Sequence, residues 1–174
     1  AVPASAVIAL ACAFYFFNQM LRESEGNETM QQIAQYVREG AMSYLKQQYK
    51  VVLIVFMVLV LLFSLMAYFG LQNPWVPFAF LSGGFFCGLA GLFGMKTATY
   101  ASARTAHAAS KSLNQGLQIA FRSGAVMGLV VVGLALVDIS GWYLILNHFI
   151  DDAEPGHKLI VVTTTMLTFG MGAS

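Results

Sequence analysis

The chain of 174 residues is strongly apolar: 58% of its residues are hydrophobic, 10% are charged, and the formal net charge is +1. An ordinary soluble domain is about 25% charged, so the composition argues against that class and indicates a membrane protein. The chain also lacks a basic cluster interleaved with aromatic residues, the usual pattern of a nucleic-acid-binding surface, so no nucleic-acid partner is expected.

Five apolar segments are predicted to be membrane helices. They lie at about 3–21, 51–70, 75–95, 124–146 and 159–174, the last incomplete. A helix of about 20 apolar residues crosses the hydrocarbon layer. We therefore expect an all-α, multi-spanning helical bundle that forms a single transmembrane domain over residues 1–174. No basic region precedes the first segment, which disfavours a signal peptide. Both ends read as interrupted membrane helices, so we expect a piece of a longer protein.

Of two polar stretches, 22–50 lies between the first and second spans and 96–123 lies between the third and fourth. Asn27 is a candidate N-cap for a helix that starts at Glu28. Apolar residues then recur at steps of three and four, which predicts an amphipathic helix running into the second span. The second stretch is rich in alanine and has no proline, so a helix is favoured there over a disordered loop.

Basic residues predict the orientation, because Lys and Arg concentrate on the cytoplasmic side. The two polar stretches contain Arg22, Arg38, Lys46, Lys50, Lys96, Arg104, Lys111 and Arg122. The turn after the second span has none, and the acidic loop near Asp151 has only Lys158. We therefore expect both polar stretches to be cytoplasmic and the amino terminus to lie outside. Trp75, Trp142 and Tyr143 then fall near the outer interface.

Glycines in the third and fourth spans are predicted to mediate helix packing. Those of the third span recur at steps of four and three, and those of the fourth are spaced by four: Gly84, Gly88, Gly91, Gly94, Gly124 and Gly128. Glycine lets a neighbouring backbone approach closely in a membrane. The alternative is that these are glycines merely tolerated in membrane helices. Both readings concern packing and not chemistry.

Asp138 is a candidate intramembrane carboxylate, and such a group is a functional hypothesis by default. A hydrated interfacial position, or a bond to a neighbouring helix, is the alternative. His148 and His157 lie near the acidic loop, but their spacing is irregular, so no metal site is predicted. Cys12 and Cys87 are interpreted as small packing residues. The sequence contains no phosphate-binding P-loop.

Three motifs together carry a family resemblance. They are REGAMSYLKQQY at 38–49, GMKTATYASART at 94–105 followed by AFRSGAVMG at 120–128, and FGMGAS at 169–174. In this order, each beside a span boundary, they resemble the membrane-integral pyrophosphatases. Members of this family couple hydrolysis of inorganic pyrophosphate to export of protons or sodium ions.

The resemblance implies that the chain is the amino-terminal part of a sixteen-helix pump and mainly outer-ring scaffold. It implies Mg²⁺, bound by residues outside this chain, and K⁺ as a further cofactor. It also implies a homodimer in the lipid bilayer, of the bacterial inner-membrane type. The catalytic and gate residues are expected after Ser174, so no catalytic residue is assigned here. Ser174 itself is at most a neighbour of the ion path.

This reading predicts that the parent protein is an enzyme and that the 174-residue segment alone is inactive. The alternative is a non-enzymatic helical membrane scaffold, or part of a secondary transporter. Transporters show broken helices and internal repeats, and neither is evident in this sequence.

Overall fold

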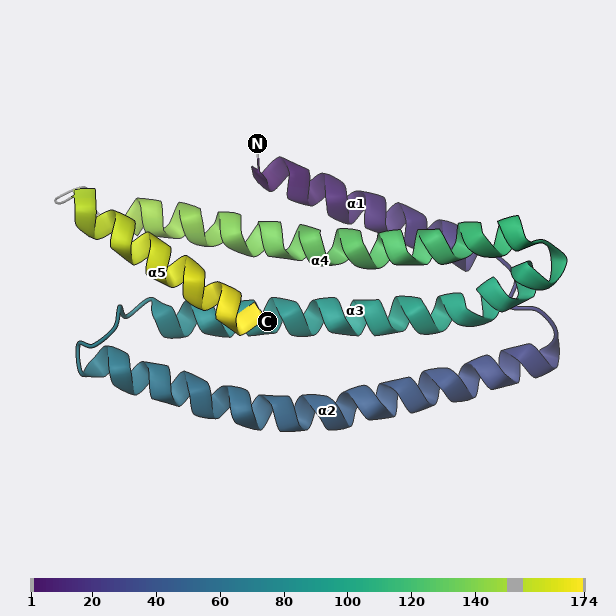
Figure 1. Ribbon diagram of the computed structural model, residues 1–174, viewed down its shortest axis with the longest axis horizontal. Helices are drawn as coiled ribbons and strands as arrows, with labels where there is room; N and C mark the ends of the chain where they lie inside the picture. Colours follow the sequence, from purple (N-terminus) through teal and green to yellow (C-terminus); the bar gives the residue numbers. More distant parts are fainter. Residues whose placement is uncertain (1, 150–154, 174) are drawn as a thin grey trace.

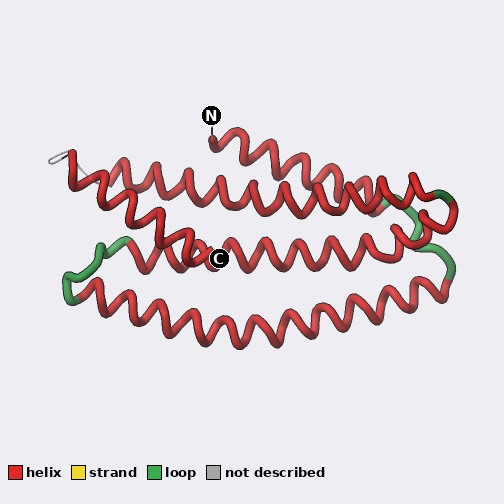
Figure 2. The backbone as a smooth tube through the Cα atoms, in the orientation of Figure 1, coloured by secondary structure: helices red, strands yellow, loops and turns green. Residues whose placement is uncertain are grey.

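The computed structural model describes residues 2–149 and 155–173, and this part of the chain is built from helices alone. The helices are α1 (Val2–Leu21), α2 (Glu28–Tyr68), α3 (Val76–Lys111), α4 (Leu113–Phe149) and α5 (Pro155–Ala173), as Figure 1 shows. Figure 2 shows them joined by short connections, without a strand in the described ranges. The predicted all-α bundle is therefore confirmed.

Helices α1 to α4 are each long and apolar enough to cross a membrane, whereas the apolar run of α5, Leu159–Ala173, is shorter. Most of their apolar side chains face outward, and none of the most apolar window of α2 is buried within this chain. Such exposure would be costly in water but is favourable against lipid. The arrangement therefore fits a bilayer on the outer faces of the bundle.

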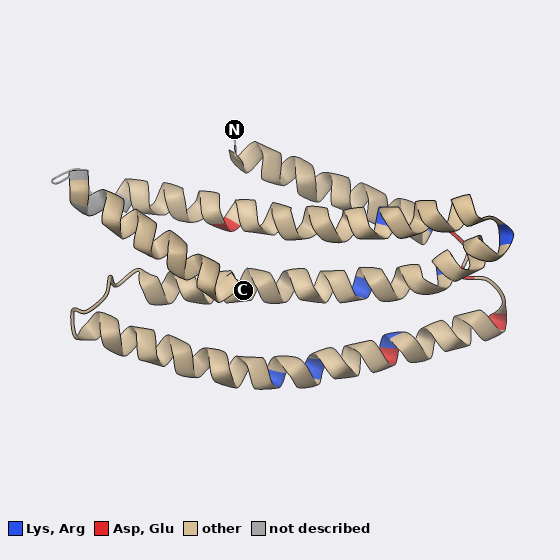
Figure 3. Cartoon of the chain, in the orientation of Figure 1, with Lys and Arg blue, Asp and Glu red and all other residues tan. Residues whose placement is uncertain are grey.

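The polar stretches extend the helices beyond the apolar spans. Asn27 caps α2, and its side chain accepts a hydrogen bond from the backbone N–H of Met30 at 3.3 Å. The predicted cap and the helix start at Glu28 are both confirmed. With 41 residues, α2 is about 60 Å long, twice the thickness of the hydrocarbon layer. Figure 3 shows most charged residues in the half of the bundle that holds the α1–α2 and α3–α4 connections.

Helix α3 is the centre of the bundle, since it packs against α2, α4 and α5. Its contact with α2 is largely aromatic: the Phe80 ring stacks on Phe56 at 4.5 Å and meets Phe63 edge-on at 5.0 Å. Farther along, the Tyr49 hydroxyl of α2 donates a hydrogen bond to the Gly88 carbonyl. Helix α1 packs mainly against α4 and has few contacts with α3.

Two apolar clusters lie toward opposite ends of the bundle. One joins α3, α4 and α5, and its buried members are Ala79, Trp142, Leu146, Val161 and Phe169. The other joins α1, α3 and α4, and its buried members are Met20, Ala101, Ala108 and Ile119. The small alanines of α3 in both clusters allow the large side chains of the neighbouring helices to pack against its backbone.

A close helix approach occurs where α3 and α5 cross, and it depends on two glycines. A Cβ atom at Gly83 would lie 2.6 Å from the carbonyl oxygen of Phe169. One at Gly172 would clash with the backbone of Phe80. Real Cβ atoms do not approach backbone atoms this closely, so any larger residue at either position would push the helices apart. Neither glycine stood out in the sequence.

The glycines that did stand out have different surroundings. Gly84 lies against the Phe56 ring, Gly91 against the Tyr49 hydroxyl, and Gly94 against Met127 of α4. Three others, Gly88, Gly124 and Gly128, have nothing within 4 Å of a Cβ placed there. A packing role for these three remains a prediction that would need partners outside the described chain.

We expect Gly83→Ala to lower the stability of the folded protein by about 1–3 kcal/mol, because the methyl group overpacks the α3–α5 crossing. Gly88→Ala is the matched control on the same helix. It gains the same helix propensity, up to about 1 kcal/mol, and meets no neighbour. Thermal unfolding of the detergent-solubilised full-length protein measures both. Equal melting temperatures for the two variants would contradict the crossing.

Candidate functional site

A group of ionic residues ties the α1–α2 connection to α2 and α3. This ion cluster, as we call it, consists of Glu23, Glu25, Arg38, Tyr100 and Arg104. Glu23 and Glu25 belong to the connection, Arg38 lies on α2, and the other two lie on α3. Segments that are remote in the sequence therefore meet at a single carboxylate, Glu25.

Arg104 is the most buried charged residue of the cluster, with 9% of its side chain exposed. One of its terminal nitrogens lies 2.8 Å from Oε1 of Glu25 and donates to the Tyr100 carbonyl at 2.7 Å. Its Nε donates to the backbone carbonyl of Glu23 at 3.0 Å. The planar guanidinium can serve these three acceptors at once, which the single ammonium of lysine does less well.

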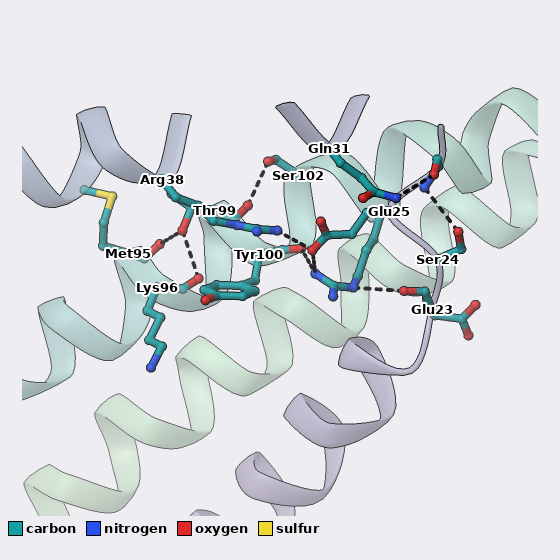
Figure 4. Close-up of polar contacts among 12 residues, drawn as sticks. Glu23, Ser24, Glu25, Gln31, Arg38, Met95, Lys96, Thr99, Tyr100 and Ser102 are labelled. Carbon is teal, nitrogen blue, oxygen red and sulfur yellow. Dashed lines mark hydrogen bonds and ion pairs between the residues drawn. The ribbon is translucent and has the colours of Figure 1, made fainter. Parts of the chain in front are cut away.

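Arg38 approaches the same carboxylate from α2. It forms an ion pair and hydrogen bond with Glu25, and its guanidinium carbon lies 4.1 Å from the centre of the Tyr100 ring. Figure 4 shows Arg38 beside the face of the Tyr100 ring and next to Glu25. A cation over an aromatic face is attracted by the ring's electrons. The Tyr100 ring therefore stabilises the positive charge of Arg38, while the Glu25 carboxylate pairs with both arginines.

The connection can reach α3 because its backbone turns sharply at Gly26. This residue has a φ of +93°, a conformation that glycine adopts without the steric cost of a Cβ. The backbone N–H of Gly26 donates a hydrogen bond to the Ser24 hydroxyl at 3.2 Å, and the Gln31 side chain donates one to the Gly26 carbonyl at 3.0 Å.

Helix α4 also contacts the connection, because Arg122 forms a longer ion pair with Glu23, at 3.8 Å.

The ion cluster is suited to holding the chain together and not to binding a metal. Glu25 already faces two arginines, whereas a Mg²⁺ ion needs several free oxygen ligands. In residues 2–149 and 155–173, no group of three or more His, Cys, Asp or Glu could hold a metal ion. The described residues therefore do not fit Mg²⁺, which the family resemblance assigns to residues outside this chain, and we derive no catalytic step from them.

Asp138, the candidate intramembrane carboxylate, is buried with 6% exposure and contacts a neighbouring helix. Its carboxyl group lies near the Ser82 hydroxyl of α3, which donates a hydrogen bond to the Ala79 carbonyl at 3.0 Å. The Ser82 hydroxyl also accepts a hydrogen bond from the Trp142 indole N–H at 2.7 Å. The second carboxylate oxygen, Oδ2, is buried without a hydrogen-bond partner in the described chain. This geometry favours the interpretation of Asp138 as a residue that links α4 to α3, while a functional role stays a hypothesis.

Ser174, the predicted neighbour of the ion path, lies outside the described residues, as do Asp151, Asp152 and Glu154 of the acidic loop. Both cysteines are unpaired and exposed on the outer faces of the helices. Sequence reasoning missed the ion cluster, because it used Arg38 and Arg104 only as indicators of orientation. A signal was present: the polar stretch 22–50 contains as many acidic as basic residues, Glu23 and Glu25 among them.

Comparison with known proteins decides the family. Residues 7–174 match the family described as inorganic H+ pyrophosphatase. The chain belongs to this family. The resemblance carried by the three motifs is thereby confirmed, and the match covers all five helices except the first turn of α1.

Relatives in the family include pumps for both ions. A protein of Bacteroides thetaiotaomicron named "Putative K(+)-stimulated pyrophosphate-energized sodium pump" is 69% identical over 176 residues, which cover 99% of this chain and 24% of the relative. A "K(+)-insensitive pyrophosphate-energized proton pump" of Methanosarcina mazei is 38% identical, over 99% of this chain and 23% of the relative. A "K(+)-stimulated pyrophosphate-energized sodium pump" of Thermotoga maritima is 36% identical, over 85% and 20%. The chain thus spans about a quarter or less of these relatives' length.

We expect Arg104→Met to destabilise the protein by about 3 kcal/mol, because it removes a largely buried charge from its carboxylate partner and two carbonyls. Arg122→Met is the matched control. Its ion pair is longer and more exposed, so its loss should cost no more than about 1 kcal/mol. Chemical unfolding of the full-length protein in detergent compares the two. If both substitutions had the same small effect, the ion cluster would not hold the connection in place.

Proposed function

We propose that the protein to which this chain belongs is a membrane pump that couples hydrolysis of inorganic pyrophosphate to the export of protons or sodium ions. The observation that carries the proposal is the family match over nearly the whole chain, together with relatives whose names describe such pumps. The bundle of apolar helices fits a transport protein. A non-enzymatic scaffold or a secondary transporter has no specific observation in its favour.

Sodium is the ion that the comparisons favour. The 69% identical relative is named as a sodium pump, and the relative named as a proton pump is 38% identical. The same names suggest stimulation by K⁺. We therefore propose a K⁺-stimulated sodium pump, and we treat proton export as the alternative that the experiment below must separate.

Within this pump, we propose that the present segment is scaffold. The charged groups of the ion cluster are engaged with one another, and Asp138 is buried beside Ser82 of α3. Among the described residues, no group of three or more His, Cys, Asp or Glu is placed to hold the metal ions of a diphosphate. Binding of Mg-pyrophosphate and formation of the ion gate are then tasks of residues outside this chain.

The proposal is tested with the purified full-length protein in lipid vesicles. Addition of Mg-pyrophosphate should release phosphate and load the lumen with ²²Na⁺, and K⁺ should raise both rates. The 174-residue segment, reconstituted in the same way, should release no phosphate. Proton uptake without sodium uptake would reverse the choice of ion. A full-length protein that is inert toward pyrophosphate in all three cation conditions would overturn the proposal.

We further propose that the end of the bundle with the ion cluster is cytoplasmic and that the amino terminus lies outside. The basic residues of the polar stretches support this orientation. Ser110→Cys at that end should be protected from an impermeant thiol reagent in intact cells, and Leu71→Cys at the opposite end should react. Both positions are exposed, and Cys12 and Cys87 are replaced beforehand. The reverse labelling pattern would invert the orientation.

A further inference from the structure

A groove opens on the membrane-facing side of the bundle, where α1 and α3 diverge over the surface of α4. It encloses about 250 Å³ and is lined by residues of all three helices. The groove exists because α1 packs along α4 and has few contacts with α3. Ala13, which lines it from α1, is too small to fill the space. We call this cavity the α1–α3 groove.

The lining of the groove is apolar apart from two adjacent residues, Lys96 and Thr97. The Thr97 hydroxyl donates its hydrogen bond to the Phe93 carbonyl one turn earlier, at 2.8 Å. Thr97 therefore has its hydrogen bond within the helix, and Lys96 is the side chain that brings charge to the groove. A ligand that fits must be hydrocarbon along most of its length and must place any polar group near Lys96.

The groove runs lengthwise from the charged end of the bundle toward the middle of the spans. Lys96, Phe17 and Val126 line it nearest the charged end, and Leu10 and Leu134 line it at the greatest depth. The eight residue steps from Val126 to Leu134 correspond to about 12 Å of helix. This is a large part of one leaflet of a hydrocarbon layer about 30 Å thick.

Lys96 has an exposed side chain and no ion pair among the residues of the described chain. It comes directly after the predicted third span, at the boundary between hydrocarbon and water. Its apolar stem can follow the helix surface while the ammonium reaches the level of the head groups. The charge is thus placed where the phosphates of the adjacent leaflet lie.

We propose that the α1–α3 groove is a binding site for an anionic phospholipid of the leaflet at the Lys96 end. One acyl chain lies in the groove along α4, and the phosphate group is bound by the ammonium of Lys96. The assignment rests on two features of the groove. Its deep part is apolar and suits an acyl chain, and the positive charge of Lys96 at its rim suits a phosphate group. The site does not depend on the proposed pump activity.

The test uses delipidated full-length protein in detergent and native mass spectrometry with added phosphatidylglycerol or phosphatidylcholine of identical chains. Phosphatidylglycerol should be retained more tightly. Lys96→Gln should weaken its binding about fivefold, the effect of one basic residue on an anionic lipid, and Lys96→Arg should restore it. Lys50→Gln is the matched control, because it removes an equally exposed charge near the start of the second span but does not line the groove.

A second measurement locates the lipid without a substitution. Phosphatidylglycerol with a photoreactive diazirine in mid-chain should label peptides from α1, α3 and α4 around Leu10 and Leu134. Val130→Phe, which fills the groove, should reduce this labelling and the retention of both lipids. Labelling elsewhere only would mean that another segment covers the groove. That result, or equal effects of Lys96→Gln and Lys50→Gln, would overturn the proposal.

Discussion

The constraint on which this structure depends is that the hydrocarbon layer offers no hydrogen-bond partners. Backbone groups are then satisfied within helices, and polar side chains need partners of their own. Helix α5 shows how this is met: Thr163, Thr164, Thr165 and Thr168 each donate to a carbonyl one turn earlier, at 2.5–2.8 Å. The hydrogen-bond donors of these hydroxyls are thereby satisfied within the helix, so Thr165 can be fully buried. A row of threonines thus costs the membrane helix little.

The hydrocarbon layer also shapes the contacts between helices, and glycine matters there because it has no side chain to keep two backbones apart. Lipid tails are as apolar as leucine, so helices associate through close packing more than through the hydrophobic effect. The crossing at Gly83 and Gly172 brings α5 onto the backbone of α3. Polar contacts then lie beside such close approaches, as with Ser82, Asp138 and Trp142 next to Gly83. Tight backbone contact and shielded hydrogen bonds support each other.

Patterns within one segment were predictable from the sequence, and pairings between segments were not. The Asn27 cap and the continuous helix α2 follow from local spacing, and the helical nature of the first part of 96–123 follows from its alanines. The break at Ser112, where α3 ends and α4 begins, was not predicted. Such local patterns do not reveal which helix packs against which. A glycine stripe shows that close approach is allowed on a face, but Gly83 and Gly172 are in contact only because α5 folds back across α3.

The candidate site was predictable to a smaller degree, for the same reason. Asp138 could be singled out because a carboxylate in a span is rare, but its neighbour Ser82 lies on another helix. The ion cluster needs three segments, and each of its charges alone looks like a solvated cytoplasmic residue. Only the fold reveals that Glu25 faces Arg38 and Arg104. The motif-based resemblance supplied the family, but it could not supply these contacts.

With the exception of Arg22, which is exposed and forms no ion pair with a carboxylate in the described chain, the basic residues at the charged end divide by type. In the described chain, the ion pairs with carboxylates are all made by arginine, at Arg38, Arg104 and Arg122. Lys46, Lys50 and Lys96 remain exposed along the helices near the ends of the spans. A guanidinium is weakly hydrated and serves several acceptors in one plane, whereas an ammonium is strongly hydrated and moves on a flexible stem. Arginine therefore suits the interior of the ion cluster, and lysine suits the surface where water and lipid phosphates meet. The basic residues at this end thus serve two purposes. The arginines hold the α1–α2 connection, and the lysines leave positive charge available to the membrane surface.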